Sequence, residues 1–173
     1  MEGLEIERRF LVRPGFSEKN LPMAFMNGEY SIWQAYLKKF SKGSGRRRIR
    51  LVIDRRKDST AYFLTEKKPT ENPMVRIENE KEINKEEFDR LQRDERDPSR
   101  DVITKVRYCF DWKGQKFELD FFFSPPRLSD LVILEIELDN PDKKVELPDF
   151  IPIAVEITTS RDLSNSNLAK RPQ

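Results

Sequence analysis

Apolar and polar residues alternate with a period of two along most of this chain. Such alternation sends successive side chains to opposite faces of an extended strand, so that one face packs in a core while the other stays polar. Short turn-forming links join several of these runs, which favours antiparallel hairpins over parallel crossovers. The predicted strands span residues 4–12, 31–40, 46–54, 62–68, 74–83, 102–112, 115–123 and 131–138, with a further short strand at 155–158.

One of these links, Lys42-Gly43-Ser44-Gly45, contains two glycines, as phosphate-binding loops do. No Gly-Lys-Ser or Gly-Lys-Thr sequence follows it, so the tip of a hairpin is the better interpretation. Lys113-Gly114 is expected to form another such tip.

The hydrophobic pattern changes once from a period of two to a helical period, which predicts a helix from Asn84 to about Arg93. The Asn84 side chain can cap the first turn, and Glu87 three residues later completes a box-like pair ahead of Phe88 and Leu91. Shorter helical segments are expected within residues 15–21 and 160–170. The aromatic residues are predicted to pack on the outer face of the sheet, against this helix: Trp33, Trp112 and Phe121–Phe123.

Residues 1–173 are predicted to form a single domain. Pro125-Pro126 and the proline-containing stretch 140–152 are too short and too varied in composition to separate two folding units. The length and the 36% of hydrophobic residues are sufficient for one buried core. We therefore expect an α+β domain, mainly an antiparallel sheet with a few helices.

The charge balance excludes a simple nucleic-acid binder. Charged residues make up 37% of the chain, but 33 basic and 31 acidic side chains leave a formal net charge of only +2. A non-specific nucleic-acid binder normally carries a clear basic excess, because its affinity comes from releasing phosphate counterions. Nucleic acid is therefore not the expected partner.

Several residue types are absent or rare, and this limits the kinds of catalytic and metal site that the chain can form. The chain has no histidine, which excludes catalytic triads with histidine, zinc–histidine sites and imidazole acid–base catalysis. Cys109 is the only cysteine, so no intrachain disulfide is possible and a reducing, cytoplasmic setting is expected. No apolar stretch is long enough to cross a membrane, and no secretory signal is present at the N-terminus.

The polar faces of the predicted strands carry charges in an unusual arrangement. Three strands place two carboxylates on one face, which is repulsive unless cations compensate. Other strands carry faces that are purely or largely cationic. The residues that share a face within a strand are Glu5, Glu7 and Arg9; Arg46, Arg48 and Arg50; Arg76, Glu78, Glu80 and Glu82; Lys105 and Arg107; Glu118 and Asp120; and Glu135 and Glu137.

Two interpretations of these faces compete. An ordinary sheet would show its charges to water, as most alternating strands in soluble proteins do. A sheet closed into a barrel would instead bring the carboxylates and the cations around one axis. Such a lumen would hold divalent cations through carboxylate oxygens and neutralise phosphate with arginine and lysine. The paired carboxylates favour the lumen, and a metal-bound polyphosphate is then the expected ligand.

The ordered motifs resemble the CYTH, or triphosphate tunnel metalloenzyme, superfamily over nearly the whole chain. Glu5-Ile6-Glu7-Arg8-Arg9 matches the family's opening Glu-x-Glu-x-Lys, except that Arg9 stands where lysine is usual. Arginine keeps the charge, but it cannot lose its proton as a lysine can. The other matching segments are Arg48-Ile49-Arg50, 64–67, 76–83, 105–108, Glu118-Leu119-Asp120, 134–138, 156–158 and 165–169.

This resemblance implies an eight-stranded closed barrel with flanking helices and a role for each matched residue. The implied metal ligands, for Mg²⁺ or Mn²⁺, are Glu5, Glu7, Glu118, Asp120, Glu135 and Glu137. The implied phosphate-binding residues are Arg9, Arg48, Arg50, Lys67, Arg76, Lys105, Arg107 and Arg161, the last at one end of the tunnel. Glu5, Glu7, Glu80 and Arg9 are the implied catalytic group, in which Glu80 ligates metal or positions water. Gln34 and Tyr36 are interpreted as packing residues.

The resemblance further implies a metal-dependent triphosphatase that hydrolyses inorganic tripolyphosphate or a related triphosphate by in-line attack of water. A class IV-type adenylate cyclase is the alternative enzyme, and a non-catalytic module that binds polyphosphate or nucleotide is the alternative from another class. Arg9 gives the binding module some support. The sequence leaves open which triphosphate and which metal are used, and whether the protein is a homodimer.

Overall fold

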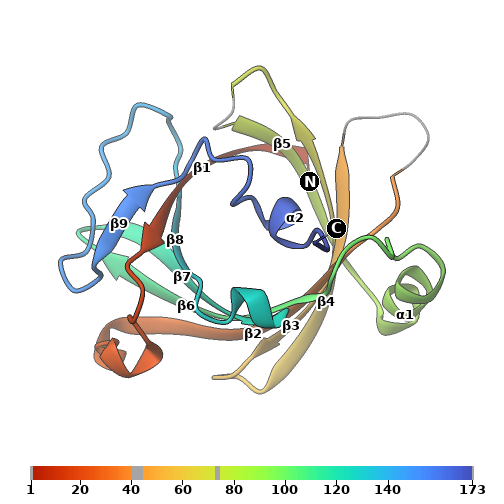
Figure 1. Ribbon diagram of the computed structural model, residues 1–173, viewed down its shortest axis with the longest axis horizontal. Helices are drawn as coiled ribbons and strands as arrows, with labels where there is room; N and C mark the ends of the chain where they lie inside the picture. Colours follow the sequence, from red (N-terminus) through yellow and green to blue (C-terminus); the bar gives the residue numbers. More distant parts are fainter. Residues whose placement is uncertain (1, 40–44, 73–74, 173) are drawn as a thin grey trace.

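The computed structural model, which describes residues 2–39, 45–72 and 75–172, is an antiparallel sheet closed into a barrel (Figure 1). The strand order is β5-β4-β3-β2-β6-β7-β8-β1, and pairing of β5 with β1 closes the ring. A further strand, β9, pairs with the end of β1. The strands are β1 (Glu2–Val12), β2 (Met26–Tyr36), β3 (Arg46–Asp54), β4 (Ser59–Pro69), β5 (Val75–Ile83), β6 (Ile103–Trp112), β7 (Gln115–Ser124), β8 (Val132–Glu137) and β9 (Ile153–Glu156).

The predicted closed barrel of eight strands is confirmed, and most strand bounds agree to within about three residues. The second strand differs most, because it begins at Met26 instead of residue 31 and ends at Tyr36. Pairing with β6 accounts for the early start, since Gly28 lies opposite Cys109. A Cβ at Gly28 would come within 2.8 Å of the Tyr30 ring, so this segment needs a glycine to pair so closely. Residues 40–44, with the predicted Gly43 hairpin tip, lie outside the described residues.

Helical structure within the described residues is limited. The main helix is α1 (Lys85–Asp94), which begins as predicted with the Asn84 side chain accepting a hydrogen bond from the Glu87 backbone N–H at 2.8 Å. The predicted segment 160–170 is helical only in α2 (Asn165–Leu168), and the predicted segment 15–21 only in the single turn η1 (Glu18–Asn20). A further turn, η2 (Met23–Phe25), follows it. A third turn is η3 (Pro126–Leu128). None of the described helices is long and apolar enough to span a membrane.

Helix α1 covers the outer face of β2–β5. Phe88 and Leu91 are its buried residues, and they join a core that contains Ala35, Ile49 and Leu64. The Phe88 ring lies 4.9 Å from Tyr62 and 5.6 Å from Trp33, measured between ring centroids. This confirms that Trp33 packs on the outside of the sheet.

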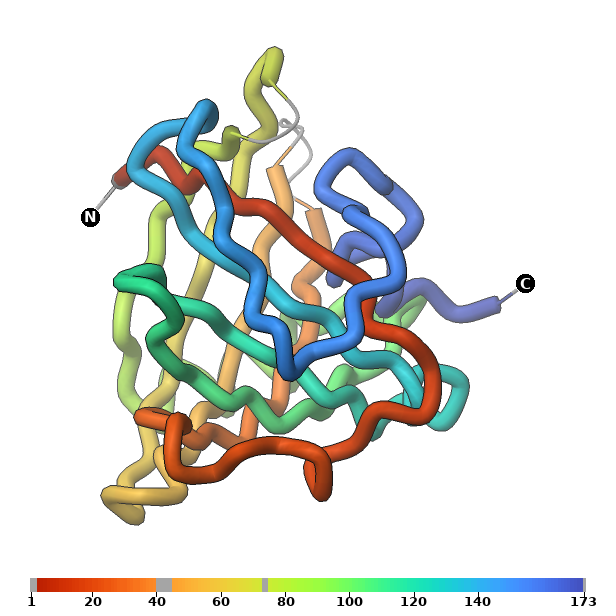
Figure 2. The backbone as a smooth tube through the Cα atoms, turned by 90° about the vertical axis from the view of Figure 1, so that its left-hand side faces the viewer, coloured from red at the N-terminus to blue at the C-terminus, as the bar shows by residue number. Residues whose placement is uncertain are grey.

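A second and larger core lies outside β6, β7, β8 and β1. The segments that follow β1 and β8 cover it, and Figure 2 shows the latter crossing the outside of the barrel. Phe16 stacks on Phe121, and Trp112 packs edge-on against Phe150. The prediction for Phe122 was wrong, because strand alternation turns this ring to the opposite face from Phe121. Its ring lies 5.4 Å from the Lys105 ammonium.

The C-terminal segment closes one end of the barrel. Figure 1 shows α2 within the ring of strands. Leu168 of α2 and the preceding Leu163 pack with Tyr36, Ile103 and Ile133. Apolar contacts therefore hold α2 at this end, while both large cores lie on the outer face of the sheet. The fold thus leaves the other face of every strand to line a lumen.

We expect Phe88→Ala to lower the free energy of unfolding by about 3–5 kcal/mol, because it removes the ring that joins α1 to Trp33 and Tyr62. Urea unfolding measures this loss. Arg93→Ala, at an exposed position of the same helix, is the matched control and should change the free energy by less than about 0.5 kcal/mol. Equal effects of the two substitutions would contradict the packing of α1.

Candidate active site

The charged faces of the strands point into the lumen. Arg9, Lys105, Asp120 and Glu135 are each less than 8% exposed, which excludes the interpretation that these charges face water. Strand pairing sets Arg107 opposite Asp120, so cationic and acidic faces are neighbours around the axis. The barrel thus provides the compensating cations that the paired carboxylates require.

Arg107 is at the centre of the deepest ion-pair network. Its guanidinium donates to Asp120 Oδ1 and Oδ2, both at 2.7 Å, to Glu135 Oε2 at 2.9 Å, and to Glu118. Lys105 donates to Asp120. Burial, together with the nearby Arg107 charge, lowers the pKa of Lys105 to about 8. The Lys105 ammonium is therefore held in the lumen by Asp120 against the cost of burial.

Arg9 extends this network to the C-terminal segment. Its Nε donates to Glu135 Oε1 at 2.7 Å, and its Nη1 donates to the Leu163 carbonyl at 2.8 Å. Its Nη2 is buried without a hydrogen-bond partner among the described residues. Burial alone would raise the pKa of Glu135, but the Arg9, Lys105 and Arg107 charges hold that pKa well below its ordinary value. Glu135 is therefore fixed as a carboxylate between cations.

A second network lines the opposite wall. The Lys67 ammonium lies 2.5 Å from Glu5 Oε1 and 2.7 Å from Glu78 Oε2. Burial, with the charges of Glu7 and Glu78, raises the pKa of Glu5 to about 7 although Lys67 opposes the rise. Glu5 and Glu78 thus compete for a single ammonium, and Glu5 is the one that gains a proton more readily.

A third contact set involves β3, β4 and β5. Arg50 pairs with Glu80, and Thr65 Oγ1 donates to the same carboxylate at 2.6 Å. Arg76 Nη1 lies 3.0 Å from Glu7 Oε1. These pairs add β3 to the charged strands around the lumen and leave Glu80 and Glu7 bound to cations.

Glu137 differs from the other lumen carboxylates. It lies opposite Glu7 in the β1–β8 register, and none of the described residues forms an ion pair with it within 4.0 Å. Glu137 is exposed at the end of β8, yet partial desolvation raises its pKa, and the like charges of Glu118, Glu78 and Glu7 add to the rise. Within the described residues no three acidic or thiol side chains form a ready metal cluster. Glu137 is nevertheless the lumen carboxylate that the described cations compensate least.

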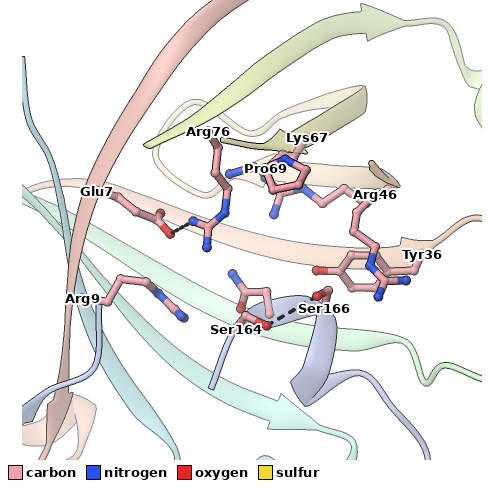
Figure 3. A pocket seen from close by; sticks show the side chains of 11 residues that line it. Glu7, Arg9, Tyr36, Arg46, Lys67, Pro69, Arg76, Ser164 and Ser166 are labelled. Carbon is pink, nitrogen blue, oxygen red and sulfur yellow. Dashed lines mark hydrogen bonds and ion pairs between the residues drawn. The ribbon is translucent and has the colours of Figure 1, made fainter. Parts of the chain in front are cut away.

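A cavity of about 250 Å³ opens between these networks and α2 (Figure 3). On one side lie Glu7, Arg76, Lys67 and Pro69, and on the other lie Ser164 and Ser166, which contact each other at 3.4 Å. The Tyr36 hydroxyl points toward the space between them. The lining residues are Glu7, Arg9, Tyr36, Arg46, Arg48, Lys67, Pro69, Arg76, Ser164, Asn165 and Ser166.

Most of the residues that the sequence analysis proposed for the site lie in the lumen, but Arg161 does not. Its side chain is exposed and does not line the cavity, although its carbonyl accepts from Asn167 Nδ2 at 2.6 Å. The lumen also contains Arg46 and Glu78, which the alternation placed on the charged faces but which were given no role in the site. Ser164, Asn165 and Ser166 had no such signal, because they come from a segment without strand periodicity.

No protein-family model matches the chain. A search of characterised proteins finds an inorganic triphosphatase from Acetivibrio thermocellus that is 32% identical over 170 residues, which cover 98% of this chain and 96% of the relative. The chain belongs to the CYTH, or triphosphate tunnel metalloenzyme, superfamily.

Solved structures agree with this CYTH assignment. The inorganic triphosphatase NE1496 superposes with a TM-score of 0.58 and 27% identity, over 95% of this chain and 93% of its own. A putative adenylate cyclase from Bacillus halodurans superposes with a TM-score of 0.50 over 81% of this chain and 83% of its own. Its identity of 13% shows a shared fold alone.

The raised pKa of Glu5 makes the stability of this CYTH barrel depend on pH. Between about pH 4.5 and 7 the folded chain keeps a proton on Glu5 that the unfolded chain has lost, so this contribution is present below pH 4.5 and lost as the pH rises to 7. Glu5→Gln removes the titration. Urea titrations give the unfolding free energy of Glu5→Gln and of the unaltered protein at each pH. We expect the first value minus the second to increase as the pH rises from about 4.5 to 7. A difference that does not change with pH would contradict the burial of Glu5.

Proposed function

We propose that this CYTH protein is a divalent-metal-dependent triphosphatase that hydrolyses inorganic tripolyphosphate or a related triphosphate. The observation that carries the proposal is the cavity, where five cations from four strands converge around a single carboxylate, Glu7. The five are Arg9, Arg46, Arg48, Lys67 and Arg76. A concave site with this charge selects a small polyanion. The similarity to two inorganic triphosphatases supports the same substrate class.

Unpaired nitrogen atoms on three arginines of the lumen support phosphate binding. Arg9 Nη2, Arg48 Nε and Arg50 Nε are all buried without a hydrogen-bond partner in the described part of the chain. A buried donor without an acceptor is costly, roughly 1–3 kcal/mol for each group. Phosphoryl oxygens would supply the missing acceptors, and the planar guanidinium groups suit two-oxygen contacts. In this proposal Lys105, held against Asp120, adds positive charge behind the site.

The donor set also fits a divalent metal such as Mg²⁺ or Mn²⁺. Glu7, Glu118 and Glu137 offer hard carboxylate oxygens, and the raised pKa of Glu137 marks a repulsion that a cation would relieve. Glu5 joins this set when Lys67 turns to phosphate. Asp120 and Glu135, also suggested as ligands, already hold Arg107, so their role here includes fixing that cation. Once bound, the metal neutralises phosphate charge and makes a bound water more acidic.

The protein's own residues would act mainly through electrostatics. Hydrolysis spreads negative charge over the phosphoryl and leaving-group oxygens, and fixed cations stabilise that charge without a covalent nucleophile. Arg9 remains charged at any working pH, so it binds and orients phosphate rather than exchanging protons. The ion pairs that position Arg9 and Arg107 therefore belong to the proposed catalytic apparatus.

We expect the purified protein to release orthophosphate from tripolyphosphate in the presence of Mg²⁺ or Mn²⁺ and to stop when EDTA is added. Parallel incubation with ATP, followed by chromatography of the products, distinguishes hydrolysis from cyclisation. Cyclic AMP and pyrophosphate as the main products would replace the proposal with a cyclase. Tight binding of tripolyphosphate in calorimetry, without turnover under any divalent metal, would replace it with a binding module.

We expect Glu7→Gln and Glu137→Gln each to lower kcat by at least about 100-fold, because these two carboxylates lie opposite each other in the β1–β8 register and each belongs to the proposed metal-binding set. Circular dichroism and urea unfolding should remain close to those of the unaltered protein. Glu86→Gln, at an exposed position of α1, is the matched control and should keep full turnover. Full turnover in folded Glu7→Gln would overturn the role assigned to this residue.

A further inference from the structure

Gln34 is a neutral side chain enclosed in a lumen of charges. Its neighbours Trp33 and Ala35 pack in the outer core beneath α1, so the alternation of β2 turns Gln34 inward. Gln34 is 0% exposed. Tyr36, two residues further on the same face, extends its hydroxyl toward the cavity (Figure 3). Gln34 therefore lies one step along the barrel wall from the cavity.

The Gln34 amide is unpaired at both ends. Neither Oε1 nor Nε2 has a hydrogen-bond partner in the described part of the chain. Leaving two such groups unpaired inside a protein costs roughly 1–3 kcal/mol each. If this position served only for packing, methionine or leucine would fill it without leaving polar atoms unpaired. The two unpaired atoms therefore make Gln34 a candidate for contact with a ligand or with water.

The residues that pair with this part of β2 indicate which ligand would supply the missing hydrogen bonds. Gln34 pairs in register with Arg50, and Tyr36 pairs with Arg48. Arg48 Nε and Arg50 Nε are also buried and unpaired, so unsatisfied groups gather on two adjacent strands. The guanidinium groups only donate hydrogen bonds, whereas the amide both donates and accepts. This cluster thus fits a phosphoryl group accompanied by a water molecule.

We propose that Gln34 positions the attacking water, with Oε1 accepting a hydrogen bond from the water and Nε2 donating one to a phosphoryl oxygen. This role rests on the proposed triphosphatase function. The water oxygen forms the new P–O bond, and the bridging P–O bond breaks with its electron pair going to the leaving phosphate chain. Orthophosphate keeps one proton of the water, and the other is released to solvent. Gln34 takes no proton at any point.

Carboxylates near Gln34 are less suited to this task. Glu80, the acidic partner of Arg50, already accepts from both Arg50 and Thr65. The amide of Gln34 has no such competing contact among the described residues.

The test compares Gln34→Met, which keeps the length of the side chain and removes both hydrogen-bonding atoms, with the unaltered protein. We expect kcat for tripolyphosphate to fall by about 100-fold, as for a misplaced reacting group, while KM rises by no more than about tenfold through the lost Nε2 hydrogen bond. Tripolyphosphate binding in EDTA, measured by calorimetry, should likewise weaken by no more than about tenfold. Gln92→Met, on α1 and away from the lumen, is the matched control and should leave kcat unchanged.

Thermal unfolding without ligand separates this role from a structural one. Because the amide is unpaired, we expect the unfolding midpoint of Gln34→Met to equal or exceed that of the unaltered protein. A folded Gln34→Met with full kcat would overturn the role of Gln34 and leave the proposed function intact. A lowered midpoint, or a loss of binding as large as the loss of kcat, would overturn it as well. No turnover by the unaltered protein would instead overturn the proposed function, and this role with it.

Discussion

A charge inside a protein has to be paired, and this constraint governs the whole barrel. Lys105, Asp120 and Glu135 are almost completely removed from solvent, and each is held by an opposite charge. Desolvation alone would make each of them unfavourable. The near equality of acidic and basic residues in the chain is in keeping with this requirement.

A charged interior also decides where the hydrophobic stabilisation lies. The lumen contributes little apolar burial, so the outer face of the sheet has to be covered. Helix α1 covers one side, and the segments that follow β1 and β8 cover the other. The end closed by α2 also brings apolar side chains inside the ring. Stability and chemistry are thus divided between the two faces of one sheet, which lets charged residues gather without disturbing the main cores.

Strict alternation made most strands and their lumen faces predictable from sequence, down to Arg48, Glu80 and Glu135. The partners within the lumen were not predictable, because Arg107 meets three carboxylates only through the registers of β6, β7 and β8. The early start of β2 depends on pairing with β6, and alternation alone cannot show it. The wall formed by Ser164 to Ser166 was missed for a similar reason, since only tertiary contacts bring α2 into the barrel.

The position of β1 has a consequence for how the chain folds during its synthesis. Its residues pair with Ile77 on one side, with Leu134 on the other and with Val155 near its end. During synthesis β1 leaves the ribosome before β5, β8 and β9, so its pairing waits for strands that lie far along the chain. Such long sequence separations slow folding and leave strand edges open to wrong partners. The charges on β1, which later line the lumen, would meanwhile keep the waiting strand soluble.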